Sequence, residues 1–79
     1  MPAIINVSYS LGANFEAIQD QLEALASLHR GLLADSGAGF GRRNLGFSFP
    51  TTDFAEAFTA ELAGQLVREW GLEWSARAA

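Results

Sequence analysis

Alternating apolar and polar residues open the chain. One side of the stretch from Ala3 to Leu11 holds Ile5, Val7, Tyr9 and Leu11, and the other side holds Asn6, Ser8 and Ser10. Strict alternation of this kind predicts a half-buried β-strand. Gly12-Ala13-Asn14 follows as a turn, in which Asn14 is a suitable N-cap for a helix.

From Phe15 onward the apolar residues recur with the period of a helix. The stripe consists of Phe15, Ile18, Leu22, Leu25, Leu28, Leu32 and Leu33. Because this phase persists through Leu33, we expect one helix from Asn14 to about Ser36, with Gly37 as its C′ residue. Gly31 lies inside that helix and costs about 1 kcal/mol relative to alanine. A helix that ends at Gly31 is therefore the alternative.

A second alternating stretch runs from Leu45 to Phe49 and predicts a strand with Leu45, Phe47 and Phe49 facing inward. The residues before it suggest a β-hairpin whose first strand is short and rich in glycine. Arg42-Arg43-Asn44 would form the tip of that hairpin. Pro50 ends the strand, because proline cannot donate to a ladder.

A second helix is predicted after Pro50, where Asp53 and Glu56 have the spacing of a capping box. Its apolar positions recur at steps of four: Phe54, Phe58, Leu62, Leu66 and Trp70. Gly71 would cap it, followed by the apolar Leu72. A last short strand then alternates Leu72, Trp74 and Ala76 with polar residues. We expect Trp70 and Trp74 in the core.

The predicted order of elements is β-α-β-β-α-β. This is the α+β, ferredoxin-like arrangement, in which two helices pack on one face of a small antiparallel sheet. Seventy-nine residues leave room for one domain, residues 1–79. The open face of the sheet would carry only polar or small residues: Asn6, Ser8, Ser10, Asn44, Gly46, Ser48, Glu73, Ser75 and Arg77.

Charge and composition limit the partners of such a domain. Nine acidic residues against five arginines give a net charge of −4, which disfavours phosphate backbones and favours basic proteins. Because the open face lacks aromatic residues for base stacking, we expect no direct contact with nucleic acid. No apolar run is long enough to cross a membrane, and Met1-Pro2-Ala3 does not begin a secretory signal. We therefore expect a cytoplasmic protein.

The sequence offers little for catalysis or for metal binding. It contains no cysteine and a single histidine, His29, which falls within the apolar stripe of the first helix. We expect His29 to be packed and hydrogen-bonded at the edge of the core or an interface, and we expect no metal and no cofactor. The turn Leu11-Gly12-Ala13-Asn14 lacks the arginine of an acylphosphatase loop and the Cys-x-x-Cys of metal-carrying relatives. We therefore expect a protein that is not an enzyme.

Two groups of residues are candidates for partner binding. Glu16, Asp20 and Glu23 form an acidic strip on the exposed side of the first helix, at a spacing that slightly opposes helix formation. Arg42 and Arg43 follow three closely spaced glycines, and paired arginines can bind carboxylate or phosphate groups bidentately. A solvated helix face and a twisting hairpin with solvated arginines are the structural alternatives.

In size, acidity, single-domain organisation and lack of catalytic residues, the chain resembles small phage-encoded inhibitors of the anti-CRISPR type. This resemblance implies a module that docks on a basic, nucleic-acid-binding complex, and it carries no residue over to this chain. The main hypothesis is therefore an acidic inhibitor or adaptor. The alternative is a self-associating ferredoxin-like regulatory domain, a possible homodimer, that binds a small ligand at its interface.

Overall fold

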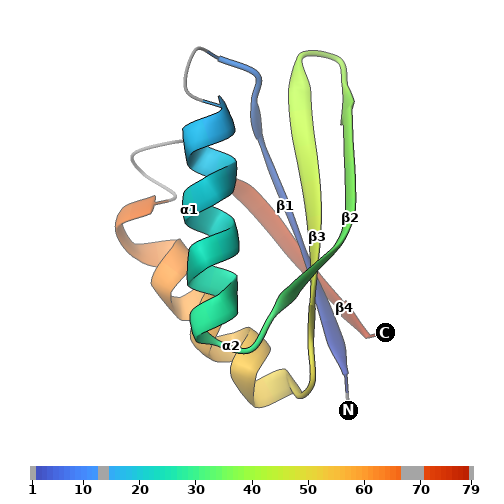
Figure 1. Cartoon of the computed structure of the whole chain (residues 1–79), viewed down its shortest axis with the longest axis vertical. Helices are drawn as coiled ribbons and strands as arrows, with labels where there is room; N and C mark the ends of the chain where they lie inside the picture. Colours follow the sequence, from blue (N-terminus) through green and yellow to red (C-terminus); the bar gives the residue numbers. More distant parts are fainter. Residues whose placement is uncertain (1, 13–14, 67–70, 79) are drawn as a thin grey trace.

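The computed structural model describes residues 2–12, 15–66 and 71–78, and it contains one four-stranded antiparallel sheet. The strands are β1 (Ala3–Ser10), β2 (Leu32–Gly39), β3 (Arg42–Phe49) and β4 (Glu73–Ala78), in the spatial order β2-β3-β1-β4. The helices are α1 (Phe15–Leu28) and α2 (Thr52–Glu61), and both lie on one side of the sheet (Figure 1). The ferredoxin-like fold predicted from the sequence is confirmed.

The core lies between the two helices and the inner strands. Each strand residue predicted to face inward between Ile5 and Tyr9, and between Leu45 and Phe49, is at most 2% exposed. Phe58 of α2 stands over the sheet, with its ring centroid 5.6 Å from that of Phe47 and 5.0 Å from that of Phe49. Such tilted aromatic pairs contribute about 0.5–1.5 kcal/mol beyond the area they bury. Leu11 was expected inside, but it follows the end of β1 and is 41% exposed.

The first helix is shorter than we predicted, and this prediction is wrong. α1 ends at Leu28, and residues 32–39 form a strand where the helix was expected to continue. Arg30 adopts φ 61° as the C′ residue, and the Gly31 N–H donates to the Ala26 carbonyl at 2.7 Å. These features define a Schellman ending with arginine in the position that glycine usually takes. The helix therefore ends at the alternative, near Gly31.

Gly31 is buried and serves a different purpose from the one expected of a helix terminator. A Cβ at this position would lie 2.5 Å from Cε1 of Phe49. The chain can leave α1 and enter β2 at this point because glycine allows the backbone to pass directly over the buried Phe49 ring.

The hairpin tip also differs from the prediction. Phe40 and Gly41 are the two loop residues, with φ values of 54° and 74°, and Gly39 pairs with Arg42 across the base of the turn. Two consecutive positive φ values in a two-residue loop are typical of a type I′ turn. Arg42 and Arg43 are thus the first residues of β3 rather than the tip.

The second helix begins two residues earlier than its expected capping box, which started at Asp53. Thr51 is the N-cap, and its hydroxyl accepts a hydrogen bond from the Phe54 N–H at 3.4 Å. The regular helix ends at Glu61 and is followed by the segment η1 (Leu62–Leu66), in which the backbone kinks at Gly64 (φ −77°, ψ −116°). Phe58 and Leu62 are buried as predicted, whereas the expected core position of Trp70 lies outside the described residues. Gly71 has a left-handed φ of 62°. The prediction that it caps this helix remains untested, because residues 67–70 lie outside the described residues.

Candidate functional site

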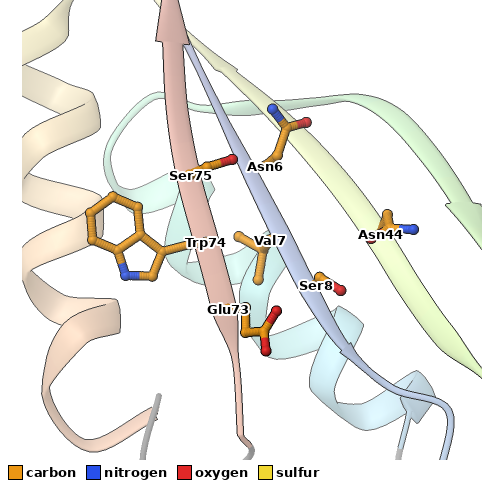
Figure 2. Close-up of a pocket in the computed structure, with 7 residues that line it drawn as sticks. All are labelled: Asn6, Val7, Ser8, Asn44, Glu73, Trp74 and Ser75. Atoms are coloured by element: carbon orange, nitrogen blue, oxygen red, sulfur yellow. The ribbon is translucent and has the colours of Figure 1, made fainter.

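The open face of the sheet is polar, as the sequence predicts. Strand register places Asn6, Gly46 and Ser75 in one row across three strands, and Ser8, Asn44 and Glu73 in the next. A shallow hollow of about 240 Å³ lies over these rows, lined by Asn6, Val7, Ser8, Asn44, Glu73, Trp74 and Ser75 (Figure 2). Its polar side chains can donate and accept hydrogen bonds, so the hollow suits a small polar molecule.

Asp35 was expected within the first helix, but it belongs to this open face. It pairs with Gly46, and a Cβ built on Gly46 would lie 3.3 Å from the Asp35 Cβ and 3.2 Å from Oδ1 of Asn6. The missing side chain at Gly46 therefore leaves room for an acid and an amide that both border this position.

Arg42 and Arg43 do not form one site, because consecutive strand residues point to opposite faces. Arg42 lies on the open face, where its Nε donates to Ser8 Oγ at 2.9 Å and its Nη1 to Ser10 Oγ at 3.5 Å. Its Nη2 is buried and has no hydrogen-bond partner among the described residues. Arg42 is thus anchored along β1, and sequence reasoning missed it as a cation on the open face.

Arg43 lies on the helix side and reaches α1. Its Nε donates to Oε1 of Gln19 at 3.1 Å, and Gln19 Nε2 donates to Oε2 of Glu23 at 3.5 Å. The structure therefore brings two of the predicted binding residues, Arg43 and Glu23, into one chain of polar contacts. Both side chains therefore interact within the domain, through Gln19, rather than only with solvent.

Tyr9 lies beneath this group of polar contacts, and its hydroxyl donates to the Phe15 carbonyl at 3.4 Å. Burial raises the pKa of Tyr9 above its ordinary value, while the charge and hydrogen bond of Arg43 oppose that rise. The nearby charge of Glu23 adds to the increase in pKa. The balance favours a neutral tyrosine.

The acidic strip of α1 is only partly free. Glu16 and Asp20 are exposed on the outer side of the helix, whereas Glu23 is half-buried beside Gln19. Within the described ranges, no cationic side chain lies within ion-pairing distance of Glu16 or Asp20. Binding of a basic protein to this strip remains a prediction.

His29 lies at the edge of the core, as predicted. Its side chain is 18% exposed, and its Nε2 lies 3.0 Å from Oε1 of Glu61. This contact joins the end of α1 to the end of α2. Next to it, the Arg30 guanidinium lies 5.5 Å from the centroid of the Phe54 ring, a cation–π contact that compensates in part for the left-handed backbone of Arg30.

The edge strand β2 has the most accessible apolar surface of the described chain. All eight of its residues are exposed. Leu32, its first residue, is 74% exposed, and Phe40 is fully exposed just beyond its end. Leu28, the last residue of α1, is 78% exposed. The sequence did not indicate this surface, because the leucines fit the stripe of the expected long helix.

Trp74 is not a core residue, contrary to the prediction. Its side chain is 40% exposed. Figure 2 shows the indole projecting from β4 toward the helices, away from the polar side chains of Asn6 and Ser8. The helices cover the inner strands more fully than they cover β4, which leaves this ring in contact with solvent.

The described residues contain no group of three histidine, cysteine, aspartate or glutamate side chains placed to hold a metal ion. None of the helices in the described part of the chain has the length and apolar character needed to cross a membrane.

No known protein family matches the chain, and no curated protein matches its sequence. Solved structures do share its shape. Formyltetrahydrofolate deformylase from Pseudomonas putida superposes with a TM-score of 0.67 and 19% identity over 100% of this chain. The enzyme from Burkholderia mallei superposes with a TM-score of 0.66 and 15% identity over 98% of this chain. The chain spans less than a third of each deformylase, 29% and 28% respectively.

Shorter proteins of similar shape correspond to nearly the whole chain. Rv0793 from Mycobacterium tuberculosis superposes with a TM-score of 0.61 and 13% identity, covering 100% of this chain and 95% of its own. A NIPSNAP family protein from Agrobacterium tumefaciens gives 0.56 and 10% identity, covering 98% and 91%. At these identities the comparisons establish the fold alone. The domain therefore has a shape that occurs both within larger enzymes and as small independent chains.

Proposed function

We propose that this chain is a self-associating ferredoxin-like regulatory domain in which two copies pair through the edge strand β2 and the open sheet face binds a small polar ligand. The observation that carries the proposal is Phe40. It combines a fully exposed aromatic ring with a left-handed backbone at φ 54°. Asparagine or glycine would fit this turn with less strain. A large ring in a strained, solvated position is explained when a second molecule covers it.

The two ends of β2 are complementary to each other under two-fold symmetry. If β2 pairs with its copy in the antiparallel direction, the hairpin tip of each molecule approaches the start of the other β2. Phe40 of one copy would then meet Leu32 of the other, and both residues are exposed in the single chain. A two-fold interface of this kind uses the same patch on both molecules. It would also satisfy the unpaired backbone edge of β2.

Charge works against this association. Each copy carries a net charge of −4, and Asp35 lies in β2 itself. Two such edges repel each other, and dissolved salt screens that repulsion. The association is therefore expected to strengthen as ionic strength rises, the opposite of what attraction between an acidic protein and a basic partner would show.

The open-face hollow supports the ligand-binding part of the proposal. Its amide, hydroxyl and carboxylate groups come from three strands, β1, β3 and β4, and leave a space of about 240 Å³. The occurrence of the same shape as a small part of two larger enzymes supports a regulatory role. The absence of catalytic activity in this chain remains a prediction, as does a role as an inhibitor of a nucleic-acid-binding complex.

Sedimentation equilibrium of Leu32→Lys tests the proposal. A two-fold pair contains the substitution twice, so we expect the dissociation constant to rise at least about tenfold if each Leu32–Phe40 contact contributes about 1 kcal/mol. The added lysine also reduces the net negative charge, which by itself would favour association. A loss of pairing therefore reports the lost contact rather than a change in net charge.

Ala57→Lys is the matched control, since it introduces the same charge at an exposed position on α2. We expect it to associate at least as strongly as the wild-type chain. The proposal is wrong if the wild-type chain is monomeric at the highest soluble concentration in high salt. It is also wrong if the two lysine variants weaken association equally.

A further inference from the structure

A second hollow lies on the helix side of the sheet, between α2 and β4. Its volume is about 210 Å³, and it shares only Trp74 with the open-face hollow. The residues that line it are Ala3, Ile5, Thr52, Ala55, Glu56, Thr59, Trp74 and Ala76. We refer to this space as the α2–β4 groove.

The shape of the groove follows from the size of its side chains. Ala3, Ala55 and Ala76 contribute only methyl groups, so the space between the helix and the strand is not filled. Trp74 supplies a flat wall that is 40% exposed. An apolar hollow with one aromatic wall suits the hydrocarbon part of a small molecule, because removing apolar surface from water is favourable.

The oxygen-bearing side chains of the groove all lie on α2, and they favour an occupant that donates hydrogen bonds, whereas Trp74 of β4 contributes only an indole N–H donor. Glu56 is the one ionisable residue among the described residues that line it, and its carboxylate only accepts. Thr59 uses its hydroxyl proton within the helix, where Oγ1 donates to the Glu56 carbonyl at 3.0 Å. The lone pairs of Thr59 remain available as acceptors. The Glu56 carboxylate and the Thr59 hydroxyl can therefore only accept hydrogen bonds from an occupant. They are complementary to an ammonium group, which has three donors and no acceptor.

From this arrangement we infer that the α2–β4 groove binds a small primary amine with an aromatic or branched aliphatic body. The body lies against the alanines and Ile5, and the ammonium group faces Glu56 and Thr59. The Trp74 ring adds an attraction for the cation where it approaches the indole face. This site does not depend on self-association through β2.

The helix dipole opposes a cation only weakly at this position. Thr51 is the N-cap of α2, so Glu56 lies in the second turn. The dipole effect falls off within the first turn. The carboxylate therefore determines the sign of charge that the groove prefers.

The inference can be tested with 2-phenylethylammonium, followed by amide chemical shifts of the isotopically labelled full chain. We expect saturable shifts at Ala3, Ala55 and Ala76. The neutral analogue 2-phenylethanol should bind about two- to fivefold more weakly, the range given by an exposed ion pair. The anionic analogue phenylacetate should bind more weakly still.

Three variants locate the site and the origin of its charge preference. Ala76→Phe fills the groove from an exposed position on β4 and should abolish the shifts. Ser75→Phe is the matched control, since the neighbouring strand residue lies on the open face and should leave binding unchanged. Glu56→Gln should reduce the difference in affinity between the amine and the alcohol, because only the attraction of the Trp74 ring for the cation would remain.

Each possible result bears on the inference. Binding to Ala76→Phe with unchanged affinity, in a variant whose spectrum shows a folded chain, would overturn the location. Equal binding of the amine and the alcohol by the wild-type chain would overturn the ligand class. The same titration at high dilution, where the chain is monomeric, should give the same affinity, which separates this inference from the proposed pairing.

Discussion

The two edges of the sheet are built differently. β2 has eight residues, one charged residue, Asp35, and an exposed aromatic ring beyond its end. β4 has six residues, including Glu73 and Arg77, and it runs beside α2 with a groove between them. Figure 1 shows the hairpin end of β2 and β3 standing apart from both helices, whereas β4 lies at the side where α2 passes.

In the two proposals above, the two edges of one small fold make different kinds of contact. Charged residues and short length discourage edge-to-edge pairing, and β4 has both. The distal half of β2, from Ser36 to Gly39, has no charged residue. A macromolecular contact therefore fits β2, whereas a small molecule fits the side of β4 that faces the helix.

Substitution of the glycines that precede the two edge strands should have the largest effect on the free energy of unfolding. The reason for glycine differs between the two strands. Before β2, Gly31 leaves room for the Phe49 ring, whereas before β4, Gly71 adopts a left-handed φ of 62°. We expect Gly31→Ala to lower the free energy of unfolding by about 2–3 kcal/mol, because its Cβ would overpack a buried ring. Gly71→Ala should lower it by about 1 kcal/mol through backbone strain alone. Urea denaturation at fixed protein concentration measures both changes.

Gly37→Ala is the control for the glycine variants. It lies within β2, and nothing is within 4 Å of an added Cβ, so its free energy of unfolding should differ by less than about 0.5 kcal/mol. If Gly31→Ala were as mild as Gly37→Ala, the chain could enter β2 without the close approach to Phe49. Steric contact with Phe49 would then not explain why glycine precedes β2.

Phe40→Asn separates folding from association at the β2 edge. Asparagine tolerates the left-handed backbone better than phenylalanine, so we expect the monomer to gain about 0.5–1 kcal/mol of stability. The same change removes the exposed ring and should weaken pairing. Thermal unfolding at low protein concentration and sedimentation at high concentration should therefore change in opposite directions. A variant that is both more stable and equally associated would refute the role of the ring.

The pKa of Tyr9 reports whether substitutions at either edge alter the core. The expected effect of those substitutions on it is the smallest of those considered. Tyr9 is the single tyrosine of the chain, so the absorbance change of tyrosinate formation at alkaline pH reports one side chain. Because the pKa of Tyr9 is raised in the folded chain, the folded state retains its proton longer than the unfolded state. Its contribution to stability is fully present below a pH of about 10, the ordinary pKa of tyrosine, and is lost as pH rises through the folded value.

We expect the absorbance titration of Tyr9 to have its midpoint above pH 10. Tyr9→Phe should remove the corresponding fall in stability at alkaline pH. Leu32→Lys and Ala76→Phe should leave the midpoint unchanged, because both substitutions lie on exposed parts of the edges. A midpoint at or below the ordinary value would show that the interior is more hydrated than this packing allows.

The elements that the sequence predicted correctly are those whose side chains meet the core. Alternation in β1 and β3 and the steps of four in α2 reflect burial, and burial determines those elements directly. β2 gave the wrong signal, since Leu32 and Leu33 continue the helical phase of α1 although Leu32 is largely exposed. Its strand conformation comes from pairing with β3, a long-range contact that no local pattern reports. A glycine at the C′ position usually marks the end of a helix in the sequence, but α1 has Arg30 at that position. The end of α1 therefore could not be recognised from a glycine at the C′ position.

The candidate site was less predictable than the fold. A correct strand register for β1, β3 and β4 was enough to place the polar open face. The separation of Arg42 from Arg43 required the position of the turn, because one residue of shift exchanges the two faces. The α2–β4 groove arises from small side chains contributed by three elements, and no single stretch of sequence brings them together.

One further feature of β2 affects how this domain can vary. Ala34 is an additional residue between Leu33, which pairs with Phe47, and Asp35, which pairs with Gly46. This bulge resets the alternation of the strand. Because Ala34 lies between two stretches that already pair in register with β3, its deletion would leave the pairing on both sides intact. Deletion of a paired residue of β2 would instead exchange the faces of the residues on one side of it.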